Sequence, residues 1–258
     1  MGLCRVENQT KQLDKYRWIG RGVYTTAEAS RLTGISPGRI RRWMEGYTFV
    51  RRGEVRTSPP VLSRGLDVFP ESEAVTISFR DLIEIMCVSG FLNAGVRWPR
   101  LRKAYEKAGE ILGIDHPFAT RRFLTDGYSV LLNIDDRFLL DLVSNQFALF
   151  EMLRPYLKTD GLDFADEFAA RWWPMGKRKP VFIDGRLSFG QPVVTQGVPT
   201  LVLYRAYIAE RRGRNGATIG ASISQTIDQK TVRYVADWYS IASRSVQAAV
   251  EYETRLAA

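Results

Sequence analysis

The segment from Thr25 to Met44, TTAEASRLTGISPGRIRRWM, constrains the fold more than any other stretch of the chain. Thr25 and Glu28 have the spacing of a capping box, in which each side chain accepts a hydrogen bond from the backbone N–H of the other residue at the start of a helix. This pair predicts a helix over about residues 26–32. Gly34, just after that helix, suits the left-handed conformation of a tight turn.

A second helix is expected over about residues 37–45. Ser36 followed by Pro37 is a typical N-cap and first helical position. The apolar spacing predicts a buried seam, which leaves the arginines of the second helix distributed around its other faces. The residues expected to line this seam are Ala27, Leu32, Ile35, Ile40 and Trp43.

The next segment, residues 46–62, reads GYTFVRRGEVRTSPPVL and predicts a β-hairpin around residues 51–53 that ends at Pro59 and Pro60. Two short helices followed by a basic hairpin favour a winged helix-turn-helix that binds DNA. Arginine suits this role because its planar guanidinium binds guanine or phosphate with two donors. The predicted DNA-binding residues are Thr26, Ser36, Arg39, Arg41, Arg42, Tyr47, Arg51, Arg52 and Arg56.

The charge of the chain is concentrated around this segment. Residues 1–60 contain twelve Lys or Arg and five Asp or Glu, a net of +7 out of +9 for all 258 residues. A basic pole of this kind indicates a polyanionic partner such as nucleic acid. An ordinary basic surface that only aids solubility is the alternative.

Further elements are expected downstream. Ser78 and Asp81 form a second capping pair ahead of a helix that starts at Phe79, and another helix starts at Pro99 and closes at Gly113. Asp126-Gly127 predicts a two-residue hairpin turn, and a helix is expected over 136–157. Three helices are expected near the C-terminus, over about 200–211, 228–238 and 242–256, with a long loop at 212–222.

The expected fold class is mainly α with small β-hairpins (α+β). The expected domain organisation is a flexible lead-in over 1–20, a winged-helix domain with an accessory hairpin and helix over 21–157, a linker over 158–178, and a small helical domain over 179–258.

The sequence gives little indication of a catalytic site or a metal site. His116 is the single histidine, and we expect it to have a structural or capping role. Cys4 and Cys87 lie in unrelated contexts, so no disulfide framework or zinc pattern is predicted. No catalytic residue, metal site or cofactor is therefore predicted. Acidic pairs such as Asp135 and Asp136 leave catalysis by carboxylates as a remote alternative.

Residues 24–49, with their Arg41-Arg42-Trp43 sequence, resemble the N-terminal winged helix of MerR-like and excisionase-like DNA-binding proteins. Residues 78–105 resemble the second helical pair of that domain. The chain departs from MerR regulators downstream, where no long heptad helix and no metal-sensing cysteine or histidine cluster follow.

The C-terminal part resembles a short antitoxin-associated domain of unknown function. The resemblance rests on Gly190–Val194, Gly197–Thr200 and Val246–Glu251. It implies a small homeodomain-like three-helix bundle that often dimerises. The two domains occur together in Vap-type antitoxins encoded beside a PIN-like ribonuclease toxin, and the loop at 212–222 is longer here than in that family.

The leading prediction is a non-enzymatic transcription regulator, the antitoxin of a toxin–antitoxin system. It would bind double-stranded operator DNA as a homodimer and would neutralise a PIN-like ribonuclease toxin. A stand-alone MerR- or excisionase-like transcription factor and a protein-interaction module without DNA binding are the alternatives. The absence of an apolar signal region or membrane-length run predicts a cytoplasmic, nucleoid-associated protein without membrane contact.

Overall fold

The structure is a computed structural model. It describes residues 21–62, 75–93, 95–121, 123, 161–214 and 227–257. The predicted lead-in 1–20, the hairpin at Asp126-Gly127, the helix 136–157 and most of the loop 212–222 lie outside the described residues.

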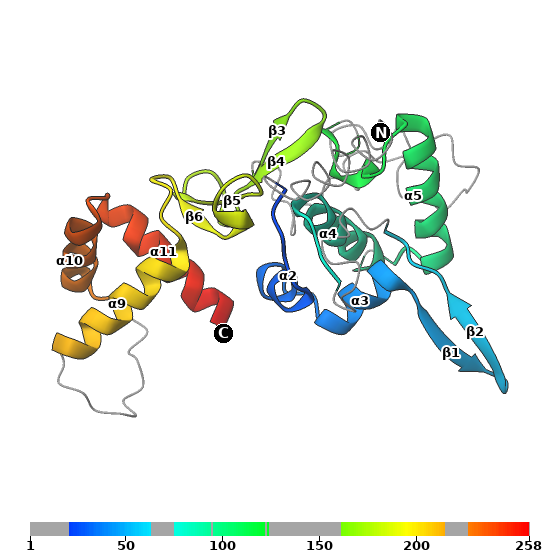
Figure 1. Cartoon of the computed structure of the whole chain (residues 1–258), viewed down its shortest axis with the longest axis horizontal. Helices are drawn as coiled ribbons and strands as arrows, with labels where there is room; N and C mark the ends of the chain where they lie inside the picture. The colour runs from blue at the N-terminus through cyan, green and yellow to red at the C-terminus, as the bar shows by residue number, and fades with distance from the viewer. Residues whose placement is uncertain are drawn as a thin grey trace, which may run out of the picture.

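The N-terminal part is built from short helices and one hairpin (Figure 1). Both predicted helices of the opening segment are confirmed, and both halves of the capping box between Thr25 and Glu28 are formed. Gly34 has a φ of 74°, as the turn requires. The elements are α2 (Thr26–Thr33), α3 (Pro37–Glu45), β1 (Tyr47–Arg51), β2 (Glu54–Ser58), α4 (Phe79–Asn93), α5 (Trp98–Leu112) and the 3-10 turn η1 (Pro117–Ala119).

Helix α4 is the centre of this part. It is buried almost all round, because α2, α5, η1 and strand β4 all pack against it. Its predicted cap is confirmed: the Ser78 backbone N–H and hydroxyl each donate to Asp81 Oδ2 at 2.7 Å. The helix from Pro99 is also confirmed as α5, which ends at Gly113 in the left-handed conformation.

A four-stranded antiparallel sheet follows, in the order β3-β4-β5-β6. Its strands are β3 (Leu162–Ala165), β4 (Phe168–Trp172), β5 (Val181–Asp184) and β6 (Val193–Val194). Strands β3 and β4 fall in the segment expected to be a linker. They are ordered as strands because Leu162, Ala169 and Trp172 are buried in the core around α4. Because β3 and β4 are structured, a lack of structure in this segment does not mark the boundary between the domains.

The C-terminal part is a bundle of three helices, α9 (Thr200–Arg214), α10 (Gln229–Tyr239) and α11 (Ser243–Ala257). All three predicted helices are confirmed, with ends shifted by up to three residues. Val181 and Val194 of the sheet join the core of this bundle, whereas Ile183 joins the core around α4. The sheet thus lies between the two helical parts, as Figure 1 shows.

The segment Arg21–Tyr24 holds these parts together. Tyr24 forms an antiparallel bridge with Ile77, just before α4. On the other side, Gly22 N donates to Gly185 O at 2.8 Å, and the buried Tyr24 hydroxyl donates to Gly190 O at 2.8 Å. Burial raises the pKa of Tyr24, so the hydroxyl stays a neutral donor.

A second connection joins α2 to the C-terminal helix. Glu253 of α11 is 2% exposed and accepts hydrogen bonds from Arg31 of α2 and from the Thr200 hydroxyl at the start of α9. Gln191 adds a weaker bond to Glu28 of α2 at 3.4 Å. A buried carboxylate needs partners of this kind, because an unpaired charge in the interior costs several kcal/mol, roughly 3–5 when one partner is removed.

Helices and strands coexist throughout, so the predicted α+β class is confirmed. No helix among the described residues combines the length and apolar character that crossing a bilayer requires.

The junction at Tyr24 predicts a large cost for Gly190→Ala. Gly190 has a φ of 83°, and an added Cβ would overlap the Tyr24 ring and hydroxyl. Left-handed strain of about 1–2 kcal/mol and overpacking of about 1–3 kcal/mol should lower the unfolding midpoint by roughly 5–12 °C for a chain of this size. Differential scanning calorimetry measures this shift.

Gly213→Ala is the matched control, because its Cβ would meet no atom within 4 Å and its position is helical. It should leave the midpoint unchanged or slightly higher. The double variant Tyr24→Phe with Gly190→Ala should lose less stability than the two single variants lose together, since it lacks the hydroxyl that the new methyl group meets. Equal melting of Gly190→Ala and the wild type would contradict the close packing of Gly190 on Tyr24.

Candidate nucleic-acid interface

Helices α2 and α3 pack on the N-terminal core through one shared seam. Ile35, Ile40 and Trp43 are buried in it as predicted, and Leu32 is partly buried against it. Ala27 is exposed, which corrects the prediction. Ala29 is fully buried in its place, because the face of α2 that meets α4 carries position 29.

The three arginines of α3 lie in different surroundings. Arg39 stacks its guanidinium over the Trp43 ring, with Cζ 5.2 Å from the ring centroid. Arg42 donates from Nε to Gly38 O at 3.2 Å and lies 5.8 Å from the Tyr47 ring centroid. Arg41 keeps 65% of its side chain exposed, and its nearest carboxylate, Glu45, is at 3.9 Å. An exposed pair at this distance is worth at most about 0.5 kcal/mol, so the Arg41 donors stay available to a ligand.

Ser36 occupies the N-cap position of α3, but its side chain makes no capping hydrogen bond. The predicted N-cap position of Ser36 and first helical position of Pro37 are thus confirmed, but the capping hydrogen bond that serine commonly makes there is not formed. The Ser36 side chain is exposed. Its backbone carbonyl instead accepts from the N–H groups of Arg39 and Ile40.

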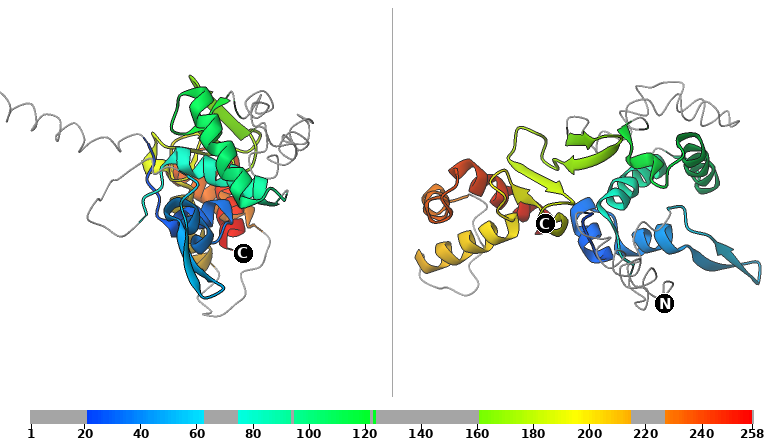
Figure 2. Two further views of the ribbon diagram at one scale, coloured as in Figure 1. Left: turned by 90° about the vertical axis from the view of Figure 1, so that its right-hand side faces the viewer. Right: turned by 45° about the horizontal axis from the view of Figure 1, so that its top comes forward.

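The hairpin β1–β2 projects from the body beside α3 (Figure 2). Nine of its ten strand residues are exposed, so neither face of the hairpin is covered by the described part of the chain. Its turn places Arg52 and Gly53 at positive φ, 55° and 81°. Arg51 and Arg52 are thus at the tip, while Arg56 pairs with Glu54 at 3.1 Å.

The base of the hairpin is held firmly. Gly46 passes so close to the Ser58 carbonyl that any Cβ would collide with it. Arg102 of α5 donates to Pro59 O at 2.7 Å, and the Trp43 carbonyl accepts from Val61 N at 3.0 Å. The hairpin therefore keeps a defined direction relative to α3, even though its strands are exposed.

The structure brings most of the predicted residues to one end of the molecule. Arg39, Arg41 and Arg42 lie on α3, and the Arg42–Tyr47 contact joins that helix to the hairpin, which carries Arg51, Arg52 and Arg56. Thr26 lies at the start of α2, half-buried. None of these contacts tests DNA binding, which stays a prediction.

Sequence reasoning missed the apolar character of the hairpin surface. Val50 and Val55 are 70% and 75% exposed, and the half-exposed Phe49 ring packs on Tyr47 at 5.7 Å between centroids. The signal was present in the sequence, since residues 47–50 are all aromatic or β-branched and Val55 lies among charged residues. Only the structure shows that nothing in its described part covers them.

No protein-family model matches this chain, but a curated relative and a solved structure are similar to it. One is the Mycobacterium tuberculosis protein named "Putative antitoxin VapB45", which is 26% identical over 190 residues, 66% of this chain and 76% of the relative. The other is the X-ray crystal structure of Rv2018 from Mycobacterium tuberculosis. It superposes with a TM-score of 0.58 at 24% identity and covers 88% of this chain and 96% of its own. The two chains share a fold.

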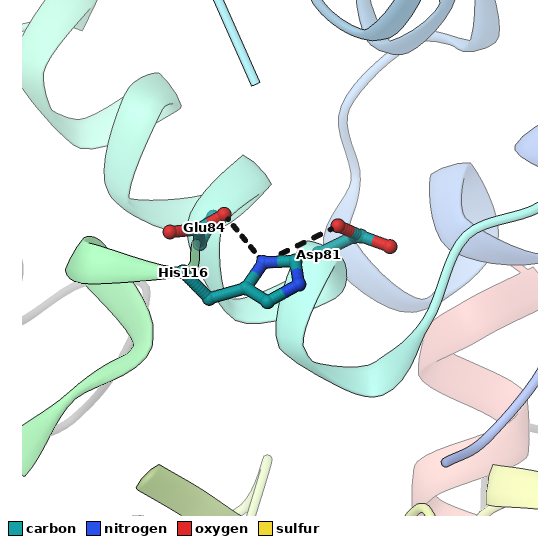
Figure 3. Close-up of side chains that lie close together, drawn as sticks. All are labelled: Asp81, Glu84 and His116. Carbon is teal, nitrogen blue, oxygen red and sulfur yellow. Dashed lines mark hydrogen bonds and ion pairs between the residues drawn. The ribbon is translucent and has the colours of Figure 1, made fainter. Parts of the chain in front are cut away.

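A buried polar cluster lies between α4 and the start of η1 (Figure 3). His116 Nδ1 is 3.1 Å from Glu84 Oε2 and 3.6 Å from Asp81 Oδ1. These three side chains are spaced closely enough to hold a metal ion. However, Glu84 also accepts from the Tyr105 hydroxyl and from Phe118 N, each at 3.0 Å. The carboxylate is thus saturated by protein donors, which favours the structural role expected for His116.

Burial and hydrogen bonding set the pKa values of this pair. Desolvation raises the pKa of Glu84, and its bonds from His116 and Tyr105 only partly oppose this. Desolvation lowers the pKa of His116, but the bond to Glu84 and the charges of Glu84 and Asp81 outweigh it, and Arg80 opposes them weakly, so the net shift is upward. The folded pair therefore retains a proton at pH values where the unfolded chain releases it.

Because the pKa values of Glu84 and His116 are both raised, we predict that the cluster stabilises the fold at low pH and loses its contribution as the pH rises. The contribution of His116 should be complete below its ordinary pKa of about 6.5 and should be lost as the pH rises through its raised folded value. Unfolding midpoints measured from pH 6 to pH 9 should decline in the wild type. In His116→Gln, whose side chain does not titrate, the decline should be shallower. An identical pH slope in the two proteins would refute the assignment.

Proposed function

We propose that this chain is a DNA-binding transcription regulator that acts as the antitoxin of a toxin–antitoxin pair. The observation that carries the DNA-binding half is the position of α3 and the β1–β2 hairpin. Both display exposed arginines at the same end of the molecule, on a helix whose direction is fixed by a buried seam. In a winged helix-turn-helix, the N-terminal half of such a helix enters the major groove and the wing contacts the flanking backbone.

In this proposal Arg39, Arg41 and Arg42 lie in or over the major groove. Arg41 has the most accessible donors, whereas the stacking of Arg39 on Trp43 and of Arg42 on Tyr47 restricts their motion before binding. Restricting a long side chain in advance lowers the entropy cost of each contact made on the DNA. Arg51 and Arg52 at the hairpin tip would reach phosphates on either side.

The antitoxin half of the proposal is supported by the similarity to the protein named "Putative antitoxin VapB45". A PIN-like ribonuclease is the toxin we propose as its partner, and a homodimer through the C-terminal bundle is the proposed assembly. That bundle carries an exposed apolar face. Trp238 of α10 is 70% exposed, with Tyr234 at 48% beside it on the same helix and Val202 of α9 at 41%.

The exposed apolar residues of the hairpin favour one alternative, a protein-interaction module without DNA binding. Val50 and Val55 would then contact a protein rather than a sugar–phosphate backbone. The same DNA-binding experiment separates the two functions.

Replacing Arg41 and Arg42 together by Ala should weaken binding to the chain's own promoter fragment by more than about tenfold, since each phosphate or base contact contributes roughly 1–3 kcal/mol. Fluorescence anisotropy at several salt concentrations measures both affinity and slope. The slope of log K against log salt should become shallower by about one for each phosphate that the variant no longer neutralises.

The matched control is Arg233→Ala with Arg244→Ala, which removes the same charge from exposed positions on α10 and α11. Affinity for the promoter should stay within about twofold of the wild type, unless non-specific charge alone drives binding. Equal weakening in the two double variants would refute α3 as the DNA-reading helix. No binding by the wild-type protein would favour the interaction module.

Trp238→Ser should weaken self-association by about tenfold or more, because a tryptophan at the centre of an interface commonly contributes 2 kcal/mol or more. Sedimentation equilibrium measures the dimer constant. Phe49→Ser, a half-exposed aromatic on the hairpin, is the control and should leave it unchanged. Weaker association of Phe49→Ser but not of Trp238→Ser would place the dimer contact on the hairpin instead.

A further inference from the structure

A basic cleft lies where the start of α4 meets strands β4 and β5. Its volume is about 170 Å³, the space of about five or six water molecules. Its walls come from three parts of the chain that are far apart in sequence: the Arg21 segment, the start of α4 with His116, and the sheet. The residues that matter for its chemistry are Arg21, Arg80, His116, Phe168, Asp184 and Arg186.

Arg80 is the central cation of this cleft. Its guanidinium lies over the Phe168 ring, with Cζ 3.7 Å from the ring centroid, which restricts its position while its edge stays accessible to solvent. Within the described residues, neither Arg80 nor Arg21 forms an ion pair with a carboxylate. Partial burial and the like charge of Arg21 together lower the pKa of Arg80, although Asp81 and Glu84 oppose this. A bound anion would relieve that repulsion.

Arg186 completes the cationic wall and is already fixed in place. Its Nε and Nη2 donate to the two carboxylate oxygens of Asp184 at 2.9 and 2.7 Å. Asp184 is 1% exposed and also accepts from Arg171 at 3.4 Å, so two guanidinium groups share its single negative charge. The lining therefore carries three arginines against one carboxylate that is itself fully engaged.

We propose that this cleft is a binding site for a small dianion, a ligand that carries a phosphoryl group or two carboxylates. Arg21 and Arg80 supply the unpaired guanidinium donors, and Arg186 supplies a positive wall whose position is set by Asp184. Guanidinium groups bind both kinds of anion through two parallel donors. The volume admits a ligand of several non-hydrogen atoms. The site lies apart from α3 and the hairpin, so it does not rest on the proposed DNA binding.

Isothermal titration calorimetry on the full chain tests this site with two probes, inorganic phosphate and malonate. The titrations are done at pH 7 and constant ionic strength set by sodium chloride. At least one probe should bind saturably, and the probe that binds identifies whether the site prefers a phosphoryl group or carboxylates. Arg80→Gln, which keeps a polar side chain but removes the charge, should weaken that binding at least tenfold.

Arg21→Gln, an exposed change with little risk to folding, should weaken binding severalfold, and Arg233→Gln on α10 should have no effect. Melting curves of each variant verify that it is folded at the titration temperature. Two results would overturn the proposal. One is that neither anion binds saturably to the wild type. The other is that Arg80→Gln and Arg21→Gln both bind as tightly as Arg233→Gln.

Discussion

The backbone of Arg21–Tyr24 is the connection on which the arrangement of the molecule depends. It bonds to Ile77 and Phe79 at the start of the central helix on one side, and to Gly185 and Phe189, which follow strand β5, on the other. The Tyr24 hydroxyl adds a bond to Gly190 O in the same segment. The two segments can approach this closely only because Gly185 and Gly190 have no side chain. A Cβ on Gly185 would lie 2.8 Å from the Arg21 backbone. The segment that carries α2 and α3 therefore starts from a point bonded both to the start of α4 and to the segment after β5.

Local chemistry predicted well the helices that lie within the described residues. The caps at Thr25 and Ser78 and the turn glycines at 34 and 113 act within a few residues, so their signals survive without knowledge of the fold. What was missed depends on contacts across the chain. Ala27 and Ala29 are indistinguishable by local pattern, and only the approach of α4 decides which is buried. Likewise, Leu162 and Trp172 form strands in an expected linker because a distant core receives them.

In the candidate site, too, some features were predictable from the sequence and others depended on contacts across the chain. The arginines of α3 and the hairpin were predictable as residues, but their orientation was not. Trp43 and Tyr47 orient two of them, Glu54 occupies Arg56, and only Arg41 and the tip residues remain largely unengaged. The cleft around Arg80 had no sequence signal, since its lining joins residues from 21 to 186. The cluster of Glu84 with His116 was equally hidden, because 32 residues separate the two.

The buried Glu253 has a consequence for how far apart two DNA-binding ends would stand. It joins the last helix to α2 through Arg31 and to α9 through Thr200, so the C-terminal bundle is in direct contact with α2. If two copies meet through their bundles, as proposed, the separation of the two α3 helices is set by the whole chain. The spacing of operator half-sites would then be a property of the scaffold, and a change of the α11 packing would re-space the site without altering any residue that contacts a base.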